Sequence, residues 1–305
     1  MAGDANPDLV LRGDVVPRFG QAEQLLDAAD LVLGGSAGIV ACGLARLGVP
    51  TTFAARVGAD VFGTFTLAAL RAAGVDTSAV EVDPRIPTGM SVILSTPGDR
   101  AILTVPGTIP TLRGDQVLAA VTAATTHLHV ASYFLQPGLA ADLPGVLAAA
   151  RARGLTTSLD TNWDPAGSWH GLTEVLAHVD VLLPNLEELR ALAMSLGASV
   201  GTSDQDAARR LAGLGPRVVV KAGAAGGWSA GADGDVVRHS GLTVEVVDTT
   251  GAGDSFDAGY LAAMAHGVTD ERERLRWATT AGSLSTLGPG GTGRQATLDD
   301  VVPAS

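Results

Sequence analysis

The sequence is poor in cysteine, lysine, aromatic residues and basic charge, and each scarcity excludes a class of protein. Its one cysteine, Cys42, allows no intrachain disulfide, and the surrounding Ala, Gly and Leu predict a small buried side chain. A net charge of −12 without any basic run argues against binding along nucleic acid. No apolar stretch is long enough to span a bilayer, and Asp4 and Asp8 interrupt any early apolar run. We therefore expect a cytoplasmic protein with neither a membrane nor a nucleic-acid partner.

The 305 residues contain 46% hydrophobic but only 4% aromatic residues, which indicates a large core of Ala, Val and Leu. Short apolar runs alternate with amphipathic segments, which predicts a parallel sheet covered by helices. The predicted strands are Leu31–Leu33, Thr51–Val57, His127–Ala131, Thr156–Asp160, Asp180–Leu183, Arg217–Lys221 and Thr243–Val247. The predicted helices are Gly38–Leu47, Val61–Ala73, Ala140–Arg153, Leu186–Leu196, Ser203–Leu214 and Asp254–His266.

Two hairpins interrupt this alternation. Met90–Ser95 and Ala101–Val105 are β-rich runs joined by the turn-forming residues 97–100, and Gly227–Ala230 pairs with Val236–His239. We interpret the first hairpin, together with the segment near Leu9–Val16, as a small β lid inserted at about 9–30 and 88–107. The chain 1–305 is otherwise one domain. Residues 3–8 are typical of a loop after a first strand, yet only two residues precede them, so that strand is missing or short.

The segment from Asp248 to Asp254, Asp-Thr-Thr-Gly-Ala-Gly-Asp, lies between a predicted strand and a predicted helix. Small residues at such a turn let backbone N–H groups converge on an anion, and the helix N-terminus adds about half a positive charge. An aspartate there can accept a proton from a hydroxyl beside a bound phosphate. The alternative is that Asp254 only caps the helix, a common duty of aspartate.

Five segments, in order, cover nearly the whole chain and resemble the ribokinase-like (phosphofructokinase B) carbohydrate kinase family. Two of them are Gly34-Gly35-Ser36-Ala37 and the run from Val57 to Gly63, which resemble the first signature of that family. The others are Asn185-Leu186-Glu187-Glu188, Lys221-Ala222-Gly223-Ala224-Ala225-Gly226 and the turn ending at Asp254. The resemblance implies a doubly wound α/β fold with a β lid, and an ATP-dependent kinase acting on a sugar.

The resemblance also implies roles for individual residues. Asp254 would be the general base, and the N–H groups of Gly251, Ala252 and Gly253 the anion hole. Asn185 and Glu188 would organise Mg²⁺ and phosphate oxygens, Glu188 through water. The nucleotide side would comprise Asn162, which follows Asp160 as Asp-x-Asn, together with Lys221, Gly223, Gly226 and Thr249. Asp248 would be the ligand of a monovalent cation such as K⁺, where the enzyme uses one.

On the sugar side the resemblance assigns Asn6, Asp8, Gly34, Gly35 and Ser36, with Phe134 as a wall of the pocket. Two positions depart from the family pattern. Ile39 replaces an asparagine that would bind the sugar, and Asp164 replaces an arginine found in kinases of acidic sugars. We therefore expect a neutral sugar as the substrate. A homodimer through the lids is also compatible with the resemblance.

Three other patterns are weaker. Gly34-x-Ser36-x-Gly38 matches a hydrolase nucleophile elbow, but too few strands precede it. Gly288 to Gly293 matches a dinucleotide fingerprint, but no βαβ unit follows it. His127 and His129 lack the Cys or acidic neighbours of a metal site. Two alternatives to a sugar kinase stay open: a nucleoside kinase of the same superfamily, and a non-catalytic relative that only binds a sugar.

Overall fold

A computed structural model describes residues 1–21, 23–96 and 99–302 and contains a central six-stranded sheet of order β12-β11-β10-β9-β8-β7. Strands β7 to β10 are parallel, and β11 and β12 are added antiparallel at one edge. The strands are β7 His127–Ala131, β8 Thr156–Asp160, β9 Val181–Leu182, β10 Arg217–Lys221, β11 Gly227–Ala230 and β12 Val236–His239. The mainly parallel sheet and the second hairpin are thereby confirmed.

The first three residues extend this sheet beyond β7. Ala2 bridges in parallel to both Val130 of β7 and Ala54, and Ala54 leads into β3 (Ala55–Gly58), which pairs with β4 (Val80–Asp83). The short first strand is therefore present as a stub. The prediction of a loop over residues 3–8 is wrong from Asn6 onward, where β1 begins and pairs with two neighbouring strands.

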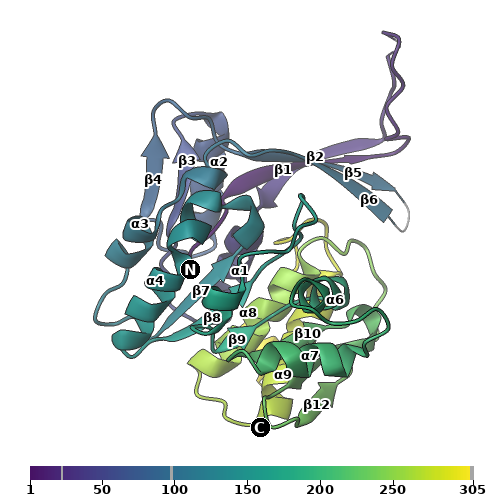
Figure 1. The fold of residues 1–305 in the computed structure, drawn as a ribbon. Helices are drawn as coiled ribbons and strands as arrows, with labels where there is room; N and C mark the ends of the chain where they lie inside the picture. The colour runs from purple at the N-terminus through teal and green to yellow at the C-terminus, as the bar shows by residue number, and fades with distance from the viewer. Residues whose placement is uncertain (22, 97–98, 303–305) are drawn as a thin grey trace.

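Helices cover both faces of the sheet, as in a doubly wound fold (Figure 1). One face buries apolar side chains such as Leu143 of α4, Leu189 of α6 and Leu211 of α7. The other face buries Leu44 of α1 and Phe256 of α8, with α9 packed along α8. The helices are α1 Ser36–Arg46, α2 Val61–Ala72, α3 Gly114–Ala119, α4 Pro137–Ala152, α5 Thr173–Leu176, α6 Leu186–Ser195, α7 Asp204–Ala212, α8 Ala252–Ala265, α9 Glu271–Ser285 and α10 Leu298–Val301.

A separate four-stranded sheet projects from the body beside the carboxyl ends of the central strands (Figure 1). Its order is β2-β1-β5-β6, with β1 Asn6–Arg12, β2 Ala28–Gly34, β5 Met90–Thr96 and β6 Asp99–Val105. We call this sheet the lid. Residues 22 and 97–98, which fall in the predicted lid and its turn, lie outside the described residues. Apolar side chains such as Phe19, between β1 and β2, are exposed, and a homodimer through the lid stays a prediction.

The predicted strand Thr243–Val247 is wrong. This segment runs as irregular chain along the end of α9, where Val247 N–H donates to the carbonyl of Thr286. Just before it, Leu242 N–H donates to Ser283 Oγ. The apolar run had predicted a strand, but here helix-end groups satisfy the backbone, and Val246 and Val247 stay more than half exposed. No helix in the described part of the chain is long and apolar enough to cross a membrane.

Candidate active site

The glycine turn before α8 is built from close backbone approaches. Gly251 is the N-cap of α8 with φ 71°, in the left-handed region that favours glycine. A Cβ there would come 2.5 Å from the Cα of Gly291, so no larger residue fits without a shift. The N–H of Ala252 donates to the carbonyl of Thr249 at 3.3 Å. The helix N-terminus thus faces the carboxyl ends of the parallel strands, where open α/β sheets bind ligands.

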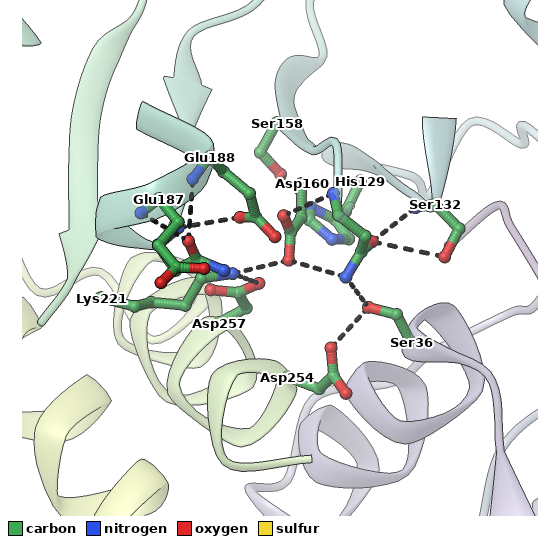
Figure 2. A network of polar contacts seen from close by, with 12 residues as sticks. Ser36, His129, Ser132, Ser158, Asp160, Glu187, Glu188, Lys221, Asp254 and Asp257 are labelled. Carbon is green, nitrogen blue, oxygen red and sulfur yellow. Dashed lines mark hydrogen bonds and ion pairs between the residues drawn. The ribbon is translucent and has the colours of Figure 1, made fainter. Parts of the chain in front are cut away.

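Asp254 is in the first turn of α8 and is not its cap, since Gly251 holds that position. Its Oδ1 accepts the hydroxyl of Ser36, which is 218 residues away in the sequence and begins α1 (Figure 2). Burial raises the pKa of Asp254 to about 7, the Ser36 hydrogen bond opposes this, and the negative charge of Asp160 adds to it. A carboxyl group with such a pKa exchanges a proton readily near neutral pH.

Lys221 ends β10, and its ammonium group lies between two buried carboxylates (Figure 2). Nζ is 2.6 Å from Oδ2 of Asp160, at the end of β8, and 3.1 Å from Oδ2 of Asp257, one turn after Asp254 in α8. Both carboxylates are fully buried, and the Lys221 side chain is 10% exposed. Their charges raise the pKa of Lys221 against the opposing effect of burial. The lysine therefore stays charged and ties three elements together.

Asn185 and Glu188 form the capping box of α6. Asn185 Oδ1 accepts the N–H groups of Glu187 and Glu188, each at 2.9 Å, and Glu188 Oε2 accepts the N–H of Asn185. Glu188 is 4% exposed, and burial and the charge of Asp160 raise its pKa to about 7, while Lys221 lowers it. Within residues 1–21, 23–96 and 99–302, no three His, Cys, Asp or Glu side chains group as ligands for a metal. A lone carboxylate fits a Mg²⁺ ion that keeps most of its water.

Asn162 connects the ion cluster to Ser36. Its Oδ1 accepts the backbone N–H of Ser132 at 2.7 Å, and its Nδ2 donates to Ser36 Oγ at 3.0 Å and lies 3.4 Å from Asp160 Oδ2. Ser132 and Asn162 both have φ in the left-handed region, at 58° and 52°. Such values are uncommon outside glycine and cluster at functional sites.

The predicted sugar residues come together where β1 meets β2. Asn6 pairs with Gly34, and Asn6 Nδ2 donates to Asp8 Oδ1 at 3.0 Å. A Cβ at Gly34 would lie 2.0 Å from Asp8 Oδ1, so glycine is required for this approach. Burial raises the pKa of Asp8 to about 7, and the charges of Asp4 and Asp254 add to the rise. Gly35 precedes Ser36 at the same corner.

Phe134 lies in an edge-to-face cluster with Tyr133 and Trp169, and Trp163 packs on Trp169. Trp163, at the end of this cluster, is 56% exposed. Nothing in the sequence had marked it as a residue that could line a pocket. Asp164 accepts N–H groups of its own loop, from residues 166, 168 and 169. Its carboxylate therefore shapes the loop.

Two lid arginines reach the glycine turn. Arg100 of β6 lies 3.4 Å from Thr249 Oγ1 and 3.3 Å from Thr250 Oγ1, and Arg12 of β1 lies 3.9 Å from Asp248. Thr249 is thus at the junction of the lid and the turn. Gly223 and Gly226 bound a single 3₁₀ turn after β10, with φ of 57° and 87°.

Asp248 is a poor fit for a monovalent cation. Its Oδ1 accepts Thr250 N–H and its Oδ2 accepts Gly290 N–H, both at 2.9 Å. These bonds and the guanidinium of Arg12 hold the pKa of Asp248 below its usual range, although burial opposes them. The guanidinium of Arg12 lies 3.9 Å from the same carboxylate and adds a positive charge there.

Residues of the three weaker sequence patterns support the fold and this site. Ser36 donates to Asp254 and not to a histidine. The Gly288–Gly293 segment supports the glycine turn through Gly290 and Gly291. His127 and His129 both bond to Ser158 Oγ, at 2.7 Å, inside the sheet.

Sequence reasoning assigned no role to several residues that the fold brings to this site: Asp4, Arg12, Arg100, Ser132 and Asp257. Asp4 accepts the N–H groups of Ser36 and Ala37 at 3.1 and 3.0 Å, so it caps α1 from 32 residues away. Only its place at the end of the first strand could have pointed to it. Asp257 could have been noted one helical turn after Asp254.

Comparisons with known proteins find relatives over nearly the whole chain. The model of the pfkB family of carbohydrate kinases matches residues 6–297. An ATP-dependent ribose-1-phosphate kinase of Halopiger xanaduensis is 32% identical over 302 residues, which are 99% of this chain and 95% of that protein. The ribokinase of Arabidopsis thaliana, solved with ribose and ATP, superposes with a TM-score of 0.83 at 26% identity, over 98% of this chain and 96% of that one. An E. coli structure solved with ATP and Mg²⁺ gives 0.83 at 22% identity, over the same shares.

Proposed function

The chain belongs to the pfkB family of carbohydrate kinases, and we propose that it transfers the γ-phosphoryl group of ATP to a hydroxyl of a neutral sugar, with Asp254 as general base. The observation that carries this proposal is the position of Asp254, in the first turn of α8 and directly after the small residues Gly251, Ala252 and Gly253. The pKa of about 7 suits a group that must take a proton from a hydroxyl and release it again.

The helix N-terminus supplies the electrostatic part of the mechanism. Backbone N–H groups of Gly251, Ala252 and Gly253 face the anion, with the partial positive charge of α8 behind them. The N–H of Ala252 would leave the carbonyl of Thr249, its weak 3.3 Å acceptor, to bind the phosphoryl oxygen. Such donors stabilise charge that develops during transfer, which is most of what phosphoryl transfer needs from a protein.

On the nucleotide side, Asn162, Lys221, Gly223, Gly226 and Thr249 border the phosphates. Lys221 acts there by its charge, because its ammonium is already held by Asp160 and Asp257. Glu188 would hold Mg²⁺ through water, with Asn185 fixing the start of α6. When bound, Mg²⁺ would screen the charges of the phosphates.

On the sugar side, Asn6, Asp8, Gly34, Gly35 and Ser36 would bind hydroxyl groups, and Phe134 would wall the pocket. Asn6 and Asp8 supply a donor and acceptors in a buried corner, which suits a neutral polyol. The lid would close over the sugar and exclude water, which otherwise competes as the acceptor of the phosphoryl group.

The test of this proposal is Asp254→Asn, assayed for ADP formation with ATP, Mg²⁺ and a panel of D-ribose, D-fructose, ribose 1-phosphate and nucleosides. Loss of a general base lowers kcat about 10²- to 10⁴-fold, with little change in the KM for ATP. Asp115→Asn is a matched control, since Asp115 is an exposed aspartate in the first turn of α3. If the Asp254 variant keeps near-normal turnover, or the wild type phosphorylates no member of the panel, the proposal is wrong.

A phosphorylated pentose is the second candidate, favoured by the two lid arginines. Arg12 and Arg100 bring positive charge to the turn and to the neighbourhood of Asp8, where Arg100 lowers the pKa of that carboxyl. The relative from Halopiger xanaduensis is a ribose-1-phosphate kinase. Preference for ribose 1-phosphate over D-ribose in the panel, lost in Arg100→Gln, would replace the neutral sugar with this substrate.

A further inference from the structure

The hydrogen bonds around Ser36 have one consistent direction. The amide oxygen of Asn162 must be the atom facing Ser132, because a backbone N–H can only donate, and the two atoms are 2.7 Å apart. The amide nitrogen therefore faces Ser36 Oγ, at 3.0 Å, and donates to it. The Asn162 side chain therefore lies between Ser132 and Ser36.

The direction of the next bond follows from this one. Ser36 Oγ accepts the hydrogen of Asn162, so its own single proton points to Asp254 Oδ1, at 2.5 Å. Oδ1 of Asp254 is consequently an acceptor already in use. Any proton that Asp254 takes up belongs on its other oxygen, Oδ2.

The row of hydrogen bonds from Asn162 through Ser36 to Asp254 is fixed at Ser36 and at Asn162. Ser36 is the first residue of α1, and its N–H is held by Asp4. Asn162 adopts φ 52°, a left-handed value that asparagine tolerates better than most residues, and its Nδ2 also lies 3.4 Å from Asp160. The backbone of Ser36 is therefore fixed by Asp4, and the amide of Asn162 cannot turn without losing its contacts with Ser132 and Asp160.

We propose that Ser36 and Asn162 are positioning residues, which fix the carboxylate of Asp254 through Oδ1 and leave Oδ2 as the atom that takes the proton of the sugar hydroxyl. This deepens the proposed function and rests on Asp254 being the base. The sugar oxygen bonds to the γ-phosphorus as the bond from that phosphorus to the leaving ADP oxygen breaks. The hydroxyl proton passes to Oδ2 and leaves to water after product release. Ser36 keeps one lone pair for a sugar hydroxyl, so both roles are compatible.

The charges around Asp254 make the hydrogen bond from Ser36 important for the pKa of the Asp254 carboxyl. The titratable groups that face it come from every packed element: Asp4 before β1, Asp8 in β1, Asp160 at the end of β8, Glu188 in α6, Lys221 in β10 and Asp257 in α8. Most are acidic and favour the protonated form of Asp254. The hydroxyl of Ser36 opposes them, because its hydrogen bond lowers the pKa of Asp254.

The experiment compares Ser36→Ala, Ser36→Thr and Asn162→Gly in the full chain; glycine adds no charge and adopts the left-handed φ of position 162. Ser255→Ala is the matched control. The hydroxyl of Ser255, the residue after Asp254, is buried and has no hydrogen-bond partner among the described residues. The pH titration of the Asp254 carboxyl is followed by ¹³C NMR, its signal identified by its loss in Asp254→Asn. We expect its pKa to rise in Ser36→Ala and Asn162→Gly, and to stay at the wild-type value in Ser36→Thr and Ser255→Ala.

Kinetics supply the second measurement, with ATP and D-ribose or ribose 1-phosphate. Loss of a hydrogen bond to a charged group lowers kcat about 10- to 100-fold and moves the acidic limb of the pH profile to higher pH. In Ser36→Ala the KM for ATP should stay unchanged. Ser36→Thr, which restores the hydroxyl, should recover most of the kcat. An unchanged pKa of Asp254 in Ser36→Ala, or a change confined to the sugar KM, overturns the proposal.

These outcomes separate the two proposals. If Asp254→Asn is inactive while Ser36→Ala matches the wild type in kcat and pH profile, the base is right and the positioning role is wrong. If Asp254→Asn stays active but the NMR titration shifts as expected, the hydrogen-bond chain exists and the catalytic assignment fails.

Discussion

Replacing Lys221 with methionine tests whether the buried ion cluster organises the site. Methionine fills much of the same volume but leaves Asp160 and Asp257, both fully buried, without the ammonium that lies 2.6 and 3.1 Å away. Removing one partner of a buried ion pair costs about 3–5 kcal/mol, because a charge is left uncompensated. At about 2.1 cal/mol/K per residue, the 305 residues have an unfolding entropy of about 0.64 kcal/mol/K. The melting temperature should therefore fall by about 5–8 °C.

The stability that Lys221→Met loses should depend on pH in a definite direction. Lys221 lowers the pKa of Asp254 and of Glu188, both of which are about 7 in its presence. Without Lys221 these pKa values rise, so the folded variant binds protons that the unfolded chain does not bind at neutral pH. The variant is therefore stabilised as pH falls through these raised values. Its deficit relative to the wild type should be largest at pH 9 and smaller at pH 6.

Thermal and urea unfolding at pH 6 and pH 9 measure both effects. Arg209→Met is the control, since Arg209 forms an exposed pair with Asp206 on α7 and its loss should cost less than about 1 kcal/mol. Adding Asp257→Asn to the lysine variant should restore part of the stability. A deficit below about 1 kcal/mol at pH 9, or one that does not shrink at pH 6, would refute this account of the cluster.

Two further predictions concern ions. Glu188→Gln should raise the Mg²⁺ concentration needed for half-maximal activity about tenfold, because a carboxylate that binds Mg²⁺ through water is lost. ATP binding in the absence of Mg²⁺ should stay unchanged. An unchanged Mg²⁺ dependence would contradict this role. Exchanging K⁺ for tetramethylammonium should alter wild-type turnover less than about twofold, because both oxygens of Asp248 already accept backbone N–H groups and Arg12 lies 3.9 Å away. Strict K⁺ dependence of the wild type would show that this reasoning fails.

Local patterns predicted most of the fold because the main elements have strong periodicity and clear ends. β7, β8 and β10 lie within the predicted ranges, and α8 begins at the expected glycine turn. The failures have physical causes. Thr243–Val247 has the composition of a strand but pairs with no strand in the described part of the chain. Asn6 enters β1 because the lid offers two partners.

The candidate site likewise has a part that the sequence predicted and a part that it did not. The sequence by itself determined the glycine turn, the capping box of α6 and the paired glycines before α1, because each depends on residues a few positions apart. Only the tertiary structure decided that Ser36 bonds to Asp254, that Asp4 caps α1 and that Lys221 is held by Asp160 and Asp257. Those contacts join segments between 32 and 218 residues apart, and they form because parallel strands bring their carboxyl ends to one edge of the sheet.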